Sequence, residues 1–372
     1  MSRLAYLDHN ATSPLRPAAL DAMVEVLRAG GNPSSVHRWG RAARASVDNA
    51  RRQVAALVGA SPAEIVFTSG GTEANNLALI GAGRRRLLVS AVEHDSVLRA
   101  AAGAETIAVD RHGIVDLPAL EGLLAASSEP ALVSVMLANN ETGVIQPIKD
   151  VVRVARAAGA LVHCDAVQAA GKMPVDFYGL GVDYLSVSAH KLGGPLGVGA
   201  LAVRSSVPFA GDRRGGGQES SRRAGTENVA GIAGFGAAAV EARAGLAVEG
   251  LRDRLEVALR AIAPDAAIHG AGAPRLCNTV CVSMPGVRAE TQVMAFDLAG
   301  VGVSAGAACS SGKVQRSTVL SAMGVAPAEA EAAIRVSLGW NSVQDDIERL
   351  IEAWQELYTR VTHSDYSRAR AA

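Results

Sequence analysis

Short, continuously apolar runs alternate with longer alanine-rich segments through the first part of the chain, and this alternation limits the possible folds more than any other feature. A strand that is apolar along its whole length must be covered on both faces, as happens in parallel sheets flanked by helices. The runs therefore predict an α/β domain with a mostly parallel sheet. The expected strands are residues 64–67, 87–89, 132–137, 161–164, 184–187 and 199–203.

The pattern changes after Asn228. A stretch rich in Ala, Leu, Arg and Glu reaches about Ile262 and predicts one long bridging helix that ends before Pro264. The residues beyond it predict a small α+β domain, with strands at 279–283 and 334–338 and a helix at 290–298.

These patterns divide the chain into three parts. We expect residues 1–15 to form an N-terminal segment that packs with the small domain. Residues 16–262 form the large domain, and residues 263–372 form the small C-terminal domain with a cysteine-bearing loop that moves.

The charges balance, because Lys+Arg and Asp+Glu both number 36. A chain with balanced charges has no long-range electrostatic field that would attract nucleic acid or an anionic membrane, so we expect neither as a direct ligand. The first residues do not resemble a secretory signal, which predicts a cytoplasmic protein. None of the four cysteines forms a C-x-x-C pair, so we expect free thiols and no metal site.

Ligands of an open parallel sheet bind beyond the carboxyl ends of its strands, so residues that follow the apolar runs are candidates for a site. The turn at 68–73 could bind a phosphate at a helix N-terminus, or could simply cap that helix. Asp165 could pair with a protonated pyridine nitrogen, or could cap a helix. Lys191 precedes a glycine-rich turn, where a dry pocket would lower its basicity and allow a Schiff base; a surface lysine is the alternative.

Two candidates lie in the C-terminal part. Cys309 lies among Gly, Ala and Ser residues, without the periodic apolar side chains that would indicate burial. These surroundings indicate an accessible and reactive thiol, whereas Cys277 and Cys281 have the surroundings of core residues. Arg335 interrupts an apolar strand and therefore needs an anionic partner. That partner is either a substrate carboxylate or an internal acidic residue.

Together these motifs resemble the cysteine desulfurases among the class V aminotransferase-like, fold-type I pyridoxal-phosphate enzymes. The loop that bears Cys309 is similar to that of the long-loop group, whose cysteine moves between the active site and an acceptor. The resemblance rests on residues 6–12, 31–35 with His37, 68–73, 93–94, 139–143, 165–168, 188–191 and 223–226, together with the Cys309 loop and Arg335.

The resemblance implies pyridoxal 5'-phosphate as cofactor and Lys191, Cys309 and His94 as catalytic residues. Lys191 would bind the cofactor covalently, His94 would stack on its ring, and Asp165 would pair with the ring nitrogen. The other implied cofactor contacts are Gly71, Thr72, Ser188 and His190 at the phosphate, Asn140 and Gln168 at the ring oxygen, and Thr226 at the neighbouring subunit's site.

The implied reaction converts L-cysteine to L-alanine, with Asn140 and Arg335 binding the substrate carboxylate. Sulfur would pass to Cys309 as a persulfide and then to an acceptor protein, such as an iron–sulfur scaffold or a component of a thiolation pathway. The role of Thr226 implies a homodimer. One alternative is another class V enzyme, such as a selenocysteine lyase or an aminotransferase. The other is a nucleotide-binding or structural α/β module without catalysis.

Overall fold

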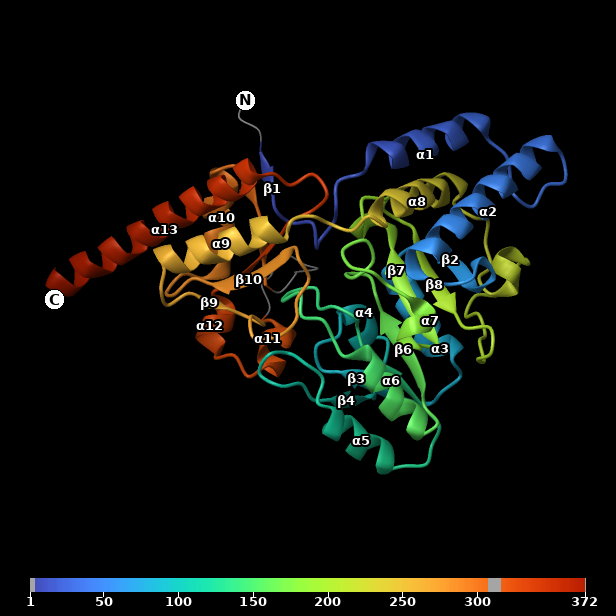
Figure 1. Cartoon of the computed structure of the whole chain (residues 1–372), viewed down its shortest axis with the longest axis horizontal. Coiled ribbons are helices and arrows are strands. Elements are labelled where there is room, and N and C mark those ends of the chain that lie inside the picture. The colour runs from blue at the N-terminus through green and yellow to red at the C-terminus, as the bar shows by residue number, and fades with distance from the viewer. Residues whose placement is uncertain (1–3, 307–315, 372) are drawn as a thin grey trace.

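A computed structural model describes residues 4–306 and 316–371, which form two lobes with separate apolar cores (Figure 1). The larger lobe contains a seven-stranded sheet in the order β2-β8-β7-β6-β5-β3-β4. All neighbouring strands are parallel except at β8, which runs antiparallel to both β2 and β7. The strands are β2 Ile65–Thr68, β3 Arg86–Ser90, β4 Glu105–Ile107, β5 Ala131–Ser134, β6 Leu161–Asp165, β7 Tyr184–Ser188 and β8 Gly199–Val203.

The sheet of the larger lobe confirms the expected α/β fold with mostly parallel strands, and six of its seven strands lie at the predicted places. The sequence did not predict β4. This strand is three residues long at the edge of the sheet, and its Thr106 is exposed, so it carries no continuous apolar run.

Helices cover both faces of this sheet because alternate strand residues point to opposite sides. Val66 and Leu201 pack against helix α3, whereas Ile65 and Phe67 belong to the core on the other face. The helices on that other face include α1 Pro17–Ala29, α2 Arg38–Val58, α5 Leu117–Ala125, α6 Ile148–Ala157, α7 Phe177–Leu180 and α8 Val229–Ala242. The opposite face is covered by α3 Gly71–Gly81 and α4 Asp95–Leu98.

The prediction of one long helix between Asn228 and Ile262 was wrong. The chain forms α8 and then a separate helix, α9 Glu249–Ile262. Gly245 lies between them with a φ of 74°, a left-handed conformation that ends a helix and that glycine adopts readily. The two helices pack into different cores: α8 belongs to the larger lobe, and Leu255 and Leu259 of α9 belong to the smaller lobe.

The smaller lobe is built on an antiparallel sheet in the order β12-β13-β10-β9. Helices α9, α10 Ala289–Leu298 and α13 Gln344–Ala371 pack on one face, and α11 Thr318–Ala322 and α12 Pro327–Glu331 pack on the other. The strands are β9 Ala267–Ile268, β10 Thr279–Ser283, β12 Ser304–Ala305 and β13 Ala333–Ser337. Within the described residues, we find no helix with the length and apolarity needed to span a membrane.

The N-terminal residues connect the two lobes. Strand β1 Ala5–Tyr6 pairs in parallel with β11 Val301–Gly302 of the smaller lobe. The chain then crosses to the larger lobe, where the Ser13 N–H donates to the His190 carbonyl at 2.8 Å (Figure 1). Residues 5–13 therefore run through the junction between the lobes. The domain boundaries drawn at residues 15 and 262 stay a prediction.

We predict that the smaller lobe depends on the fully buried Trp354 of α13, which stacks on Phe296 of α10 with 6.3 Å between ring centroids. Trp354→Ala should lower the free energy of unfolding by about 3–5 kcal/mol, because it removes apolar contacts and leaves a cavity. Urea unfolding followed by circular dichroism measures the loss. Leu298→Ala is the control, because that side chain is 89% exposed. Equal unfolding midpoints for the two variants would show that the prediction is wrong.

Candidate functional site

A cavity of about 350 Å³ lies where the carboxyl ends of the central strands face the smaller lobe. It brings together ten of the twelve residues proposed from the sequence: Gly71, Thr72, His94, Asn140, Asp165, Gln168, Ser188, His190, Lys191 and Arg335. Thr226 is exposed and lines a separate, smaller cavity with Arg223. Cys309 lies outside the described residues.

One end of the cavity combines a helix N-terminus with an unpaired hydroxyl. Gly71 and Thr72 are the first residues of α3, so backbone N–H groups there have no partner within the helix. A Cβ on Gly71 would lie 2.8 Å from Val167 Cγ2, which explains why the backbone there needs glycine. The Ser188 hydroxyl is buried without a hydrogen-bond partner among the described residues. These features are suited to an anion.

Asp165 ends strand β6 and is almost fully buried. Its Oδ2 accepts from Asn75 Nδ2 at 2.7 Å, and its Oδ1 accepts from the Val167 N–H at 2.9 Å. Burial, and then the nearby Asp165, raise the pKa of the Glu93 carboxyl well above its ordinary value, which favours its neutral form. Of these two carboxyl groups, Asp165 is the one that lines the cavity.

His94 is held in a fixed orientation at the start of α4. Its Nδ1 accepts from the Ser96 N–H at 3.0 Å and lies 2.8 Å from the Ser96 hydroxyl. An acceptor at Nδ1 leaves the proton of the neutral ring on Nε2. The ring lines the cavity on the same side as Asn75, which itself donates to Ser96 Oγ at 2.8 Å.

Lys191 follows strand β7 in the short 3₁₀ helix η2 Ala189–Lys191. Its amine donates to the backbone carbonyls of Asn10 and Ala11 at 2.6 and 2.8 Å. Burial, and then the positive charge of Arg335, lower the pKa of Lys191 to about 8. At neutral pH a useful fraction of this amine is therefore unprotonated, unlike that of a surface lysine.

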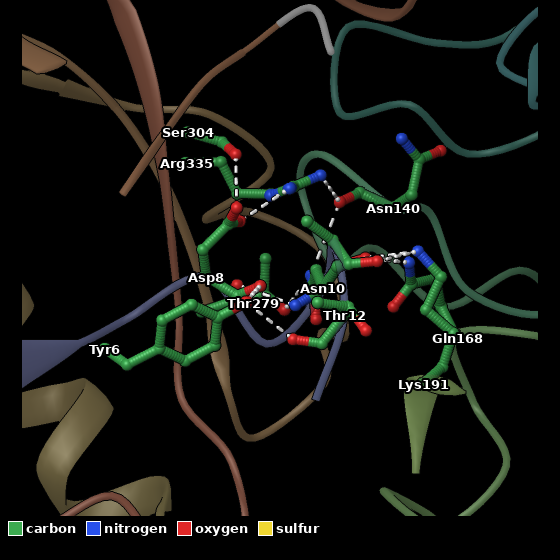
Figure 2. Close-up of polar contacts among 12 residues, drawn as sticks. Tyr6, Asp8, Asn10, Thr12, Asn140, Gln168, Lys191, Thr279, Ser304 and Arg335 are labelled. Carbon is green, nitrogen blue, oxygen red and sulfur yellow. Dashed lines mark hydrogen bonds and ion pairs between the residues drawn. The ribbon is translucent and has the colours of Figure 1, made fainter. Parts of the chain in front are cut away.

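Arg335 crosses from strand β13 to the same cavity and is 2% exposed. Its Nη2 donates to Asp8 Oδ1 at 2.8 Å and its Nη1 to the Asn140 carbonyl at 3.0 Å (Figure 2). Asp8 Oδ2 in turn accepts from the Ser304 hydroxyl at 2.7 Å. Arg335 thus has the internal acidic partner that was one of its two alternatives. Its Nε nevertheless remains without a partner among the described residues, as does Asn140 Oδ1.

Several residues of the site had no role assigned from the sequence. Asp8 and Asn10 lie in a motif that was noted, but nothing local shows that they contact Arg335 and Lys191. Asn75 lies one helical turn after Gly71 and Thr72, which is the spacing that could have indicated it. Lys172 lies beyond Gln168 and could have been suspected as a lysine among apolar residues.

Glu141 links the loop of Asn140 to the other lobe. Its Oε2 accepts from the Ser317 hydroxyl at 2.6 Å, and Ser317 also caps α11 by accepting from the Leu320 N–H. Burial raises the pKa of Glu141 to about 7, although the Ser317 hydrogen bond and Arg335 act in the opposite direction. In the sequence, Ser317 follows Cys309 by eight positions.

A mostly parallel sheet, a buried amine and a buried carboxylate around one cavity, and a second lobe that adds an arginine define a fold-type I, aminotransferase-like protein. Comparison with known proteins agrees. The family model for aminotransferase class-V matches residues 5–350. The chain is 46% identical over 364 residues to a cysteine desulfurase of Cereibacter sphaeroides, covering 93% of this chain and 94% of that relative.

Solved structures show the same likeness. A NifS-like protein from Rickettsia africae matches with a TM-score of 0.90 and 36% identity, over 96% of this chain and all of that one. A structure described as SspA in complex with cysteine matches with a TM-score of 0.78 and 29% identity, over 91% of this chain and all of that one. The chain belongs to the aminotransferase class-V family and, within it, to the cysteine desulfurases. The resemblance seen in its motifs is confirmed.

We predict that Glu141→Gln stabilises the protein in a pH-dependent way. The pKa of Glu141 is raised from 4.5 to about 7 in the folded state, so ionisation of this carboxyl opposes folding. The free energy of unfolding is therefore highest below pH 4.5, where the carboxyl is protonated, and falls as the pH rises to about 7. Glutamine cannot ionise, yet it can still accept from Ser317. The variant should therefore gain about 2 kcal/mol over the parent between about pH 5 and about pH 8.

Urea midpoints at the two pH values measure this gain, with Glu352→Gln on the exposed face of α13 as the matched control. A difference from the parent that does not change with pH would contradict the assignment of a raised pKa to Glu141.

Proposed function

We propose that this chain converts L-cysteine to L-alanine with pyridoxal 5'-phosphate, and that the sulfur leaves through a persulfide on Cys309. The observation that carries the proposal is the placement of Lys191 and Asp165, from adjacent strands, around one cavity of about 350 Å³. The cysteine desulfurase named above and the similar protein solved with cysteine support the choice of substrate.

The residues around the cavity fit the cofactor. The N-terminus of α3 and the unpaired Ser188 hydroxyl would hold the phosphate, together with His190. Burial, and then Lys191, lower the pKa of His190 to about 4, so this ring is neutral and can donate a hydrogen bond. His94 would stack on the ring, and Gln168 and Asn140 would face its oxygen. When bound, the cofactor supplies an electron sink for the electrons left behind when a substrate carbon loses its proton.

The protein groups divide the remaining work. Asp165 would keep a proton on the ring nitrogen, because its charge is buried and fixed by Asn75 and Val167. Lys191 would hold the cofactor aldehyde and, once the substrate amine has displaced it, would take the Cα proton. A pKa of about 8 suits this second task at neutral pH.

The unpaired Arg335 Nε and the Asn140 side chain would bind the substrate carboxylate. Asp8 fixes the far side of the same guanidinium, so Arg335 is held in place before the substrate arrives. Fixing the carboxylate at this point orients the substrate Cα towards Lys191.

Cys309 would then attack the substrate sulfur as a thiolate. A sulfur–sulfur bond forms and the bond from sulfur to Cβ breaks, leaving its electron pair on Cβ, so Cys309 becomes a persulfide. The carbon skeleton leaves as alanine after Cβ gains a proton and Lys191 returns a proton to Cα. This assignment rests on the sequence, because Cys309 lies outside the described residues. The persulfide would pass to an acceptor protein, either an iron–sulfur scaffold or a protein of a thiolation pathway.

We also infer a homodimer, in which the exposed Thr226 reaches the neighbouring subunit's phosphate site. The reaction would take place in the cytoplasm, where reducing conditions keep thiols free.

We predict that Cys309→Ala abolishes sulfide release from L-cysteine but leaves the yellow colour of the bound cofactor, because the thiol takes sulfur and does not hold the ring. The assay is sulfide release under excess reductant, with the absorption spectrum recorded on the same sample. Cys277→Ala is the matched control and should keep the activity. Undiminished desulfuration by Cys309→Ala would refute the role of this residue.

A further inference from the structure

Asn10 uses both polar ends of its buried side chain in the junction between the lobes. Its Nδ2 donates to Thr279 Oγ1 at 2.9 Å and to the Asn140 carbonyl at 3.3 Å (Figure 2). Its Oδ1 accepts from Lys172 Nζ at 2.7 Å and from Asn278 Nδ2 at 3.2 Å. The side chain is therefore fixed from both lobes at once.

The backbone of the same residue faces the catalytic amine. The Asn10 carbonyl accepts from Lys191 Nζ at 2.6 Å and from Gln168 Nε2 at 2.9 Å. The Asn10 N–H donates to the Ser337 hydroxyl at 2.9 Å. Because the side chain and the N–H are both held, the carbonyl cannot shift without breaking several buried hydrogen bonds. The position of Asn10 thus sets where the free Lys191 amine comes to lie.

Lys172 is the second buried lysine of this site in a chain that has only four lysines. Its amine donates to Asn10 Oδ1 and, at 2.6 Å, to Gln168 Oε1. No ion pair to Lys172 occurs within residues 4–306 and 316–371. Burial, and then Lys191, lower the pKa of Lys172 well below its ordinary value. The two hydrogen bonds of this amine therefore join the Asn10 side chain to that of Gln168.

We propose that Asn10 is a positioning residue for the free Lys191 amine, and that the buried Lys172 amine holds Asn10 in place for that task. The proposal deepens the function proposed above and rests on it for the role of Lys191 as a base. Neither Asn10 nor Lys172 needs to touch the substrate. They act through the carbonyl of residue 10, which places the amine after the substrate has displaced it.

The network also explains why the N-terminal segment runs through the site. The amine of Lys191 is desolvated, so it needs hydrogen-bond acceptors at a fixed place when it is free. The carbonyls of Asn10 and Ala11 supply them, and neither carries a charge that would hold the proton too strongly. A proton acceptor displaced by about 1 Å can lose about a hundredfold in rate, so tight placement of this amine matters.

The first test uses the apoprotein and does not depend on activity. Competitive acetylation across a pH series, read by mass spectrometry of the Lys191 peptide, gives the pKa of that amine. Asn10→Ala should lower this pKa by about half a pH unit or more, because a loosened carbonyl no longer favours the ammonium form. Lys172→Met should also lower the pKa of Lys191, because the substitution removes the amine that holds Asn10 and leaves the Asn10 side chain itself intact. The matched control, Lys149→Met on an exposed turn of α6, should leave it unchanged.

Two outcomes of this test would overturn the proposal. If the Lys191 pKa is unchanged in both Asn10→Ala and Lys172→Met, Asn10 does not position the amine. If Lys172→Met raises the Lys191 pKa, Lys172 acts as a charged neighbour and does not serve as an anchor for Asn10. Should Asn10→Ala fail to fold, Lys172→Met decides the question alone.

The second test uses the holoenzyme with L-cysteine deuterated at Cα. In both variants kcat should fall about tenfold or more and its isotope effect should grow, while KM changes less than about twofold, because only removal of the proton is slowed. An unchanged isotope effect would contradict a positioning role. If the parent enzyme itself does not consume L-cysteine, the proposed function fails while the acetylation result still tests the placement of Lys191.

Discussion

The removal of the Lys191 amine from water is the interaction on which the rest of the site depends. Burial makes the free base accessible near neutral pH, with a pKa of about 8. It also makes a misplaced amine costly, since a desolvated amine must find acceptors. The fold meets both demands by placing the lysine just after a fully buried strand and directing two backbone carbonyls at it.

The junction between the lobes is what brings the charges of the site together. The parallel sheet places Asp165 and Lys191 at neighbouring strand ends, but the arginine and its acidic partner come from the smaller lobe and the N-terminal segment. Residues 5–13 pair with a strand of one lobe and then bond to the other (Figure 1). A short length of chain thus fixes the relative position of a base and a carboxylate-binding group that lie far apart in the sequence.

Much of the fold could be predicted because burial leaves a continuous apolar pattern. Strand Thr279–Ser283 was predicted to the residue, and the sheet of the larger lobe was found through its apolar runs. The prediction failed at 229–262, where composition is helical throughout but the chain leaves the helix between Ala242 and Glu249, a stretch that contains Gly245 in a left-handed conformation. A residue type alone does not reveal whether a glycine in such a stretch is tolerated within a helix or ends it.

The site was predictable where a residue type stands at a strand end, as for Asp165 and Lys191. It was not predictable where a role depends on distant partners. Asn10 has contacts more than 150 residues away in the sequence, at Lys172 and Asn278, and no local pattern encodes them. The pairing of Arg335 with Asp8 likewise joins the two ends of the chain, so the sequence left two alternatives open.

The most direct measurement of the central claim is borohydride reduction of the enzyme reconstituted with pyridoxal phosphate, followed by proteolysis and mass spectrometry. Reduction fixes the cofactor permanently to the amine that holds it. The arrangement of the cavity predicts the added mass on Lys191 and none on Lys172, the other buried amine beside it. Label on Lys172, or on no lysine, would contradict the account.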